Sequence, residues 1–477
     1  MRAGHAAAMA ALVLAAGCGG DGPAGPPPRS TLTATLIDRD GDGVLERGPG
    51  EPLQDRTELG GGGRPAATLA TFAQITDAHV RDEESPARVP FLDRLGGVFS
   101  PAFRPQETLT AQVLAGAVRS LNRLHPQAVV VTGDLVDNAQ GNELDAARSV
   151  LSGGRVQPDS GAAGYAGVQE AGNPDPFYYR PDNDPPRHPG LLEAAQRAFD
   201  APGLDAPWYP VLGNHDLLAQ GEAQPTPAIQ AVATGDRLVE ALDPGLRPDS
   251  DTDAETAVAA LLEGGIPGRT RAVPPDASRR LLSPSETLRR LGRRGREGDR
   301  LDYAFDIGAS VRGIALDVVN RAGGDRGLVT PAQVEWLRAE LRRAGRRHIV
   351  VFSHQPLTES DGGEAALRAL DAAPRVLAAV AGHRHRNSIA PRPSGPYWLV
   401  ETASLADFPQ QARLFRLVRT AGGGVALETA MVDHDGAGLA GVARELAFLD
   451  AQGGRPRSFA GRPEDRNVRL QLPPPEP

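Results

Sequence analysis

The stretch Trp208-Tyr209-Pro210-Val211-Leu212-Gly213-Asn214-His215-Asp216 joins a short apolar run to a polar motif. Apolar runs rich in Val, Ile or Ala that end in Gly or polar residues are typical of buried strands followed by loops. The same order recurs at 69–75 before Thr76-Asp77-Ala78-His79, 128–131 before Gly133-Asp134, 349–352 before Ser353-His354, and 376–381 before Gly382-His383-Arg384-His385. The pattern therefore predicts five strands, each followed by side chains that can bind a ligand.

Helices are predicted between some of these strands. Residues 106–124 place apolar side chains on one face at helical spacing. Residues 334–344 follow Thr330 as N-cap, Pro331 at the first helical position and Gln333, which completes a capping box. Alternating strands and helices indicate a layered α/β fold, in which ligands bind beyond the carboxyl ends of the strands.

Two regions lack this alternation and carry many loop-forming Gly and Pro residues. Residues 145–207 and 217–300 are predicted to be insertions near the mouth of a site, within one main domain at 32–454. Residues 455–477 are polar and rich in Pro, so we expect a disordered tail.

An acidic loop lies near the start of the main domain. Asp38-Arg39-Asp40-Gly41-Asp42-Gly43 is similar to the first half of a calcium loop, but Pro49 stands where the bidentate Glu is needed. A hairpin turn between 32–37 and 44–45 is the favoured interpretation, and a calcium site is the alternative.

The N-terminus resembles a bacterial lipoprotein signal. An apolar stretch at 6–16 precedes Cys18 and is too short to span a bilayer, so residues 1–18 are predicted to be an export signal with Cys18 as the lipid acceptor. Ordinary cleavage without lipid is the alternative. Residues 19–31, rich in Gly and Pro, would form a flexible tether. We therefore expect an exported protein anchored in the cell envelope.

The composition of the chain excludes some kinds of binding site and favours others. The net charge of −9 argues against a broad nucleic-acid surface, and the single cysteine excludes an internal disulfide or a thiolate metal cluster. The five motifs instead supply Asp, Asn and His ligands, which suit Mn, Fe or Zn rather than Ca. Because residues two apart in a strand point the same way, Asp77 and His79 can face one ion, and so can His383 and His385.

The order of the five motifs resembles the calcineurin-like metallophosphoesterase superfamily across residues 69–420. The resemblance implies a four-layer α-β-β-α sandwich with two transition-metal ions. Carried over by residue, it implies that one metal is held by Asp77, His79 and His385, the second by Asn214, His354 and His383, and both by the bridging Asp134.

The resemblance also implies a function. A metal-bridging hydroxide would attack a small phosphomonoester or phosphodiester, with His215 as a catalytic histidine outside the metal shell and Asp216 as its orienting partner. Asp137 stands where purple acid phosphatases have a metal-binding Tyr, and Asn138 where protein phosphatases have a phosphate-binding Arg, so neither subfamily is expected. Residues 207–209, 401–404 and 408–413 resemble an exported bacterial subgroup. A non-catalytic exported binding lipoprotein is the alternative.

Overall fold

The five predicted strands belong to two large sheets. The computed structural model describes residues 27, 30–95, 102–242, 253–265, 268–296, 299–453 and 457–473. One sheet has seven strands in the order β3 (Gln54–Arg56), β19 (Val468–Gln471), β18 (Val425–Asp433), β17 (Gln411–Thr420), β4 (Pro65–Ile75), β5 (Val129–Thr132) and β8 (Trp208–Val211). The other has six, in the order β11 (Tyr303–Ile307), β12 (Val311–Ala315), β13 (His348–Phe352), β14 (Val376–Ala381), β16 (Trp398–Glu401) and β15 (Ser388–Pro391).

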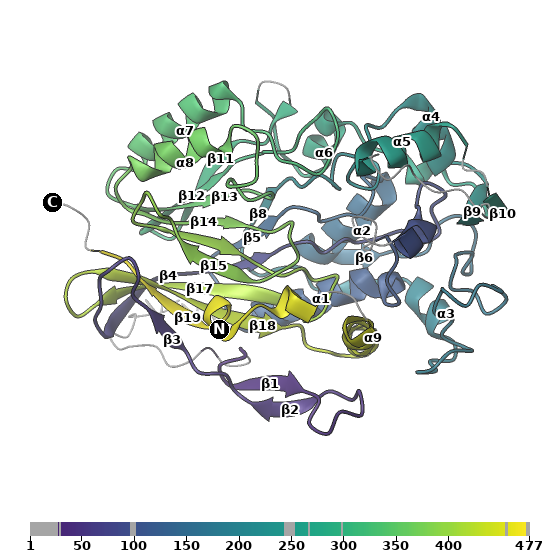
Figure 1. Ribbon diagram of the computed structural model, residues 1–477, viewed down its shortest axis with the longest axis horizontal. Coiled ribbons are helices and arrows are strands. Elements are labelled where there is room, and N and C mark those ends of the chain that lie inside the picture. Colours follow the sequence, from purple (N-terminus) through teal and green to yellow (C-terminus); the bar gives the residue numbers. More distant parts are fainter. Residues whose placement is uncertain are drawn as a thin grey trace, which may run out of the picture.

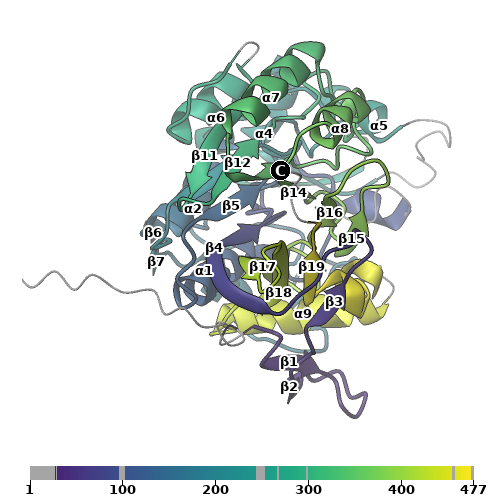
Figure 2. The ribbon, with the colours of Figure 1, turned by 90° about the vertical axis from the view of Figure 1, so that its left-hand side faces the viewer.

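The two sheets pack face to face and helices cover their outer faces (Figures 1 and 2). In β13, Val350 and Phe352 point into the core between the sheets, whereas Ile349 and Val351 point into a second core under the helices. The covering helices are α7 (Pro331–Arg343) and α8 (Gly363–Asp371) on the six-stranded sheet, and α1 (Thr110–Asn122), α2 (Gly141–Ser152) and α9 (Leu439–Gly453) on the other. The predicted four-layer α-β-β-α sandwich is confirmed.

Strand direction brings the polar motifs together. Strands β4, β5 and β8 run parallel in one sheet, and β13 and β14 run parallel in the other. All five polar motifs follow the carboxyl ends of these strands, so the candidate site lies at the edge shared by both sheets.

The two predicted helices are present. The first begins at Thr110, after the 3-10 turn η3 (Glu107–Leu109), rather than at 106. The second has the predicted capping box, because Gln333 N donates to Thr330 Oγ1 at 3.3 Å and Thr330 N donates to Gln333 Oε1 at 3.0 Å. Local sequence rules were sufficient here.

The first predicted insertion starts too early. Helix α2 packs Ala147, Val150 and Leu151 into the same core as α1, so it belongs to the main sandwich. Smaller elements follow it: β6 (Gly154–Val156), α3 (Leu191–Gln196) and β7 (Phe199–Ala201). The second region holds α4 (Pro227–Ala233), β9 (Arg237–Leu242), α5 (Ala254–Glu263), β10 (Gly268–Ala272), η4 (Ala277–Arg279) and α6 (Pro284–Arg290).

Part of the second region builds a small core of its own. Ile229 of α4 and Val258 of α5 pack with Phe91 of the 3-10 helix η1 (Pro90–Leu95). Elements α4, α5, β9 and β10 lie together at one end of the sandwich (Figure 1).

The prediction of a disordered tail is wrong for residues 457–473. After η6 (Arg457–Ala460) and η7 (Pro463–Asp465), strand β19 pairs with β18 and β3 inside the seven-stranded sheet. The physical reason is a short alternation of apolar residues in a polar, Pro-rich context, because Val468, Leu470 and Leu472 are buried.

The acidic loop is the turn of a hairpin, as the favoured interpretation predicted. Strand β1 (Ala34–Ile37) pairs antiparallel with β2 (Glu46–Pro49). Asp38 Oδ1 accepts a hydrogen bond from Gly41 N at 2.8 Å, so it stabilises the turn itself.

The predicted signal, including Cys18, lies outside the described residues. The end of the predicted tether is ordered, because Ser30 and Thr31 are buried and Thr31 N donates to the Met431 carbonyl at 2.9 Å. Within the described ranges, none of the helices combines the length and the apolar character needed to cross a bilayer.

Candidate metal centre

A glycine precedes three of the polar motifs because another motif approaches it closely. A Cβ at Gly133 would lie 2.5 Å from His354 Nδ1, and one at Gly213 would lie 2.2 Å from Asp134 Oδ1. A Cβ at Gly382 would lie 2.0 Å from Thr76 Oγ1 and 2.5 Å from Asp77 Oδ2. Glycine at these positions lets five loops from two sheets converge on one point.

The paired site residues do not lie in extended strands. Positive φ angles occur at five site residues, which are Asp77 (51°), His79 (43°), Asp134 (46°), His383 (71°) and His385 (53°). The expectation that strand alternation aims each pair is therefore wrong, since the loops turn into the left-handed region directly after the strands. Such backbone is costly for residues other than Gly, and it clusters at functional sites.

The converging side chains form two groups of potential metal ligands. Their ligand atoms lie within 4.8 Å of one another in each group, Asp77, His79 and His385 in the first and Asp134, His354 and His383 in the second. His79 Nε2 is 3.2 Å from His385 Nε2, and His385 Nε2 is 3.4 Å from Asp77 Oδ1. The first group has the residues that the resemblance implied for one metal. The second has His354 and His383 from the other implied set, together with the implied bridge Asp134. The ligand roles of these residues stay predictions.

Asp134 belongs to the second group and also lies close to the first. Its Oδ2 atom is 3.0 Å from His354 Nε2 in one group and 3.8 Å from His79 Nε2 in the other. A third cluster joins Asp134 and His79 to His215. Asp134 is therefore placed where a bridging carboxylate would be needed.

Three of the histidine rings are oriented from behind. His79 Nδ1 lies 3.1 Å from Asp137 Oδ1, and His354 Nδ1 lies 2.8 Å from the Thr132 carbonyl oxygen. His385 Nδ1 lies 2.5 Å from Asp407 Oδ2. Each Nδ1–H can donate to these acceptors, which leaves the Nε2 lone pair facing inward. His354 Nε2 is buried and makes no well-directed hydrogen bond. Inward Nε2 lone pairs beside carboxylates fit metal ions.

Asn214 stands apart from these groups in its contacts. Its Nδ2 donates to the Gly221 carbonyl at 3.0 Å, and its Oδ1 accepts a hydrogen bond from Gln355 Nε2 at 3.3 Å. The side chain is buried in the loop after β8. A ligand role for Asn214 stays a prediction.

The protein comparisons identify the family. A sequence model described as calcineurin-like phosphoesterase matches residues 70–387, a range that contains every residue of both ligand groups. The chain belongs to this family. A search of curated proteins found no significant match.

Solved structures similar to this calcineurin-like phosphoesterase were also found. A dimetal phosphatase from Danio rerio has a TM-score of 0.42 and 14% identity, covering 77% of this chain and 97% of its own. PhoD has a TM-score of 0.33 and 11% sequence identity, and the match covers 82% of this chain and 73% of the PhoD chain. The sulfate thiohydrolase SoxB of Thermus thermophilus, in complex with glycerol, has a TM-score of 0.31 and 14% identity, covering 82% and 61%.

The phosphoesterase chain surrounds its histidines with a buried charge network that the sequence analysis missed. Asp137 accepts hydrogen bonds from Arg81 Nη2 at 2.6 Å as well as from His79, and Arg81 also donates to Glu107 at 2.8 Å. Asp407 accepts hydrogen bonds from His385 and from Arg104 Nε at 2.6 Å. The Arg104 backbone N donates to Glu107 at 3.2 Å, so one network supports both histidines of the first group.

A weak sequence signal for Asp407 existed. It lies between the two stretches 401–404 and 408–413 that resembled the exported subgroup, but nothing in its spacing linked it to His385. Asp137 was noted only as a replacement for Tyr. Its buried carboxylate orients His79 and does not join the ligand groups.

The proposed pairing of Asp216 with His215 is wrong. Asp216 Oδ1 accepts hydrogen bonds from Leu135 N and Val136 N at 2.9 and 3.1 Å, and its Oδ2 accepts one from Gly213 N at 2.8 Å. The carboxylate therefore ties the loop after β8 to the loop after β5. His215 is oriented instead by the Asp137 carbonyl, 2.6 Å from its Nδ1.

Carboxylates raise the pKa of two of the four histidines in the ligand groups, whereas burial lowers the pKa of His79 to about 4 and that of His383 to about 3. Burial alone would lower the pKa of His354 and of His385. The negative charge of Asp134 outweighs this effect at His354, and that of Asp77 outweighs it at His385, so each pKa rises to about 9. Burial would raise the pKa of Asp77, yet His385 and His354 outweigh it and the pKa is lowered. Carboxylates that stabilise a proton on His354 and on His385 would also stabilise a metal cation at those positions.

Proposed function

We propose that this chain is a two-metal phosphoester hydrolase that acts on a small substrate outside the cytoplasm. The observation that carries the proposal is the pair of largely buried ligand groups, in which Asp134 of the second group also lies near His79 of the first. Two metal ions held side by side are a common means of hydrolysing phosphoesters. Mn, Fe and Zn suit the nitrogen and oxygen donors.

The ligand residues would divide as the two groups divide. Asp77, His79 and His385 would hold one cation, and His354 and His383 the other, with Asn214 as a further ligand and Asp134 between them. Cations bound there would supply Lewis acidity to a phosphoryl oxygen and acidify a water molecule.

His215 has the contacts of a proton donor. Because its Nδ1–H is donated to the Asp137 carbonyl, Nε2 is the ring atom left for substrate. When protonated, Nε2–H can donate a hydrogen bond to a phosphoryl oxygen or a proton to the leaving oxygen. The ring lies at 4.6 Å, centroid to centroid, from His79, beside the first ligand group.

Assays with two chromogenic substrates test the proposal. The purified protein, supplied with Mn or Zn, should hydrolyse p-nitrophenyl phosphate or bis-p-nitrophenyl phosphate, and Asp134→Ala should abolish the activity. Asp200→Ala is the control, since the Asp200 side chain is 79% exposed in a surface ion pair. If the protein is inactive with every metal, a non-catalytic binding lipoprotein becomes the better explanation. If Asp134→Ala remains active, the mechanism is wrong.

The proposed location outside the cytoplasm rests on the sequence alone. An apolar stretch before Cys18 supports export, and a lipid on Cys18 would anchor the protein to the membrane of the cell envelope. Cell fractionation of the wild type and Cys18→Ala tests this. The variant should leave the membrane fraction, and its retention there would contradict the lipid anchor.

A further inference from the structure

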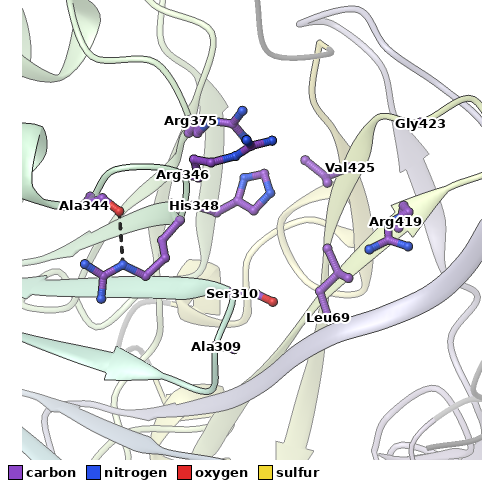
Figure 3. A pocket seen from close by; sticks show the side chains of 11 residues that line it. Leu69, Ala309, Ser310, Ala344, Arg346, His348, Arg375, Arg419, Gly423 and Val425 are labelled. Atoms are coloured by element: carbon purple, nitrogen blue, oxygen red, sulfur yellow. Dashed lines mark hydrogen bonds between the residues drawn. The ribbon is translucent and has the colours of Figure 1, made fainter. Parts of the chain in front are cut away.

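A hollow of about 420 Å³, drawn in Figure 3, is lined in part by residues at the start of β13. It opens at the start of β13, whereas the metal-site residue His354 follows the end of that strand. At about 3.3 Å per residue, His348 and His354 are roughly 20 Å apart. The hollow is therefore distinct from the metal centre. Its lining is Leu69, Ala309, Ser310, Ala344, Arg346, Arg347, His348, Arg375, Arg419, Gly423 and Val425.

The lining is strongly basic. It contains four arginines and one histidine, and none of the lining residues is Asp or Glu. The chain as a whole carries a net charge of −9, so this concentration of positive charge runs against its overall balance. A concave surface with one sign of charge attracts ions of the other sign.

Three of the arginines are available to a ligand. Within the described ranges, the side chains of Arg346, Arg375 and Arg419 make no hydrogen bond or ion pair. Arg347 is engaged, because its Nε donates to the Ala344 carbonyl at 3.1 Å and its Nη1 donates to Asp306 Oδ1 at 2.5 Å. Unpaired guanidinium groups around a hollow are the usual means of binding phosphate.

The basic groups come from both sheets. Arg346 and Arg375 lie in the loops before β13 and β14 and His348 begins β13, whereas Arg419 lies on β17 of the other sheet. Figure 3 shows Arg419 on the wall opposite Arg346, Arg375 and His348. An anion in the hollow would thus be bound from two sides.

His348 adds a neutral donor to this arrangement. Its Nδ1 atom is buried and has no hydrogen-bond partner in the described part of the chain. Burial, with a smaller effect of Arg375, lowers the pKa of His348 to about 4, so the ring is uncharged at neutral pH and can donate one N–H. Arg375 itself has φ of 72°, a conformation that is costly for Arg and typical of functional positions.

We propose that this hollow is a second site that binds the phosphate group of a small molecule or of a lipid headgroup. The volume is large enough for a phosphate with an organic group attached, and Leu69 and Val425 provide an apolar wall for that group. The inference does not depend on the proposed hydrolysis.

Calorimetric titration of the metal-loaded protein with inorganic phosphate tests the site. We expect two classes of bound phosphate in the wild type, one at the metal centre and one in the hollow. A variant with Arg346→Ser, Arg375→Asn and Arg419→Ser should weaken the second class by about a hundredfold or more and leave the turnover of bis-p-nitrophenyl phosphate unchanged. Asn is chosen at 375 because it tolerates positive φ.

Two further variants complete the experiment. Arg342→Ser, on α7 outside the hollow, is the matched control and should keep both classes. The single variant Arg419→Ser, at an exposed position of β17, gives a partial loss even if the triple variant does not fold.

Vesicle sedimentation separates the two sources of phosphate. If free phosphate is the ligand, calorimetry shows the arginine-dependent class and phosphatidylglycerol vesicles bind wild type and triple variant equally. If a headgroup is the ligand, phosphatidylglycerol vesicles, but not phosphatidylcholine vesicles, bind the wild type more strongly than the triple variant. When neither phosphate nor vesicle binding depends on the three arginines, the proposal is overturned.

Discussion

Replacing Asp407 by Asn would remove the negative charge that accepts the hydrogen bond of His385 Nδ1 and so orients this ring. Asp407 is 2% exposed, and its Oδ2 accepts the Nδ1–H of His385 at 2.5 Å. The same carboxylate accepts two hydrogen bonds from Arg104, at 2.6 Å from Nε and 3.0 Å from Nη2. The substitution therefore weakens both the orientation of the metal-facing Nε2 and a buried ion pair.

Two effects of different size follow. Loss of the partner that orients a metal-binding histidine typically costs about 10- to 100-fold in metal affinity. Breaking a buried ion pair costs about 3 to 5 kcal/mol of stability, which is a large part of the roughly 5 to 15 kcal/mol that a native protein has. We expect a folded but less stable Asp407→Asn protein that binds the first metal about 10- to 100-fold more weakly.

A control variant separates metal binding from stability. Asp435 also accepts two hydrogen bonds from an arginine, at 2.6 and 2.9 Å from Arg119, but it contacts none of the site histidines. Thermal melting should show both Asp435→Asn and Asp407→Asn to be less stable. Metal titration against a competing chelator should show weakened binding in Asp407→Asn alone. A folded Asp407→Asn protein with wild-type metal affinity would refute the proposed role.

Three other perturbations have defined outcomes. Gly382→Ala should lower metal content and activity, because its Cβ would lie 2.5 Å from Asp77 Oδ2; unchanged metal content by mass spectrometry would contradict this. A chain ending at 466 should show no cooperative melting, because three buried side chains, each worth about 1.5 to 3 kcal/mol, leave with β19. Burial raises the pKa of Asp302 in the folded protein to about 6. The ionised Asp302 carboxylate therefore lowers the free energy of unfolding above about pH 6, and this effect disappears below about pH 4, where the carboxyl is protonated in both the folded and the unfolded state. Asp302→Asn, which can keep both hydrogen bonds accepted by Oδ1, should raise stability by about 2 to 3 kcal/mol near pH 8 and by little near pH 4; an equal gain at both values would contradict the shift.

The architecture was accessible from the sequence because its determinants are local. Apolar runs at 69–75 and 349–352, each followed by a polar motif, specify strands whose carboxyl ends meet. The capping box at Thr330 is likewise a local pattern. By contrast, β19 was missed because a four-residue strand has too few alternating positions to stand out in a Pro-rich segment.

The support around the site was not accessible, because it is formed by distant residues. Asp407 and its partner His385 are 22 residues apart in the sequence, and Asp137 and its partner His79 are 58 residues apart. No spacing rule links either pair. The aim of each ligand also depends on left-handed backbone at Asp77 and Asp134, which no strand pattern predicts. Residue types and the order of the motifs predicted the candidate ligands, but only the tertiary fold shows what orients them.

Hydrolysis should require two metal ions held by these residues. Adding Mn back to chelator-treated protein, while bound metal and bis-p-nitrophenyl phosphate hydrolysis are measured on the same samples, tests this requirement. Activity should be absent without metal and should rise until two ions are bound per chain. Full activity in metal-free protein, or saturation of activity at one bound ion, would contradict it.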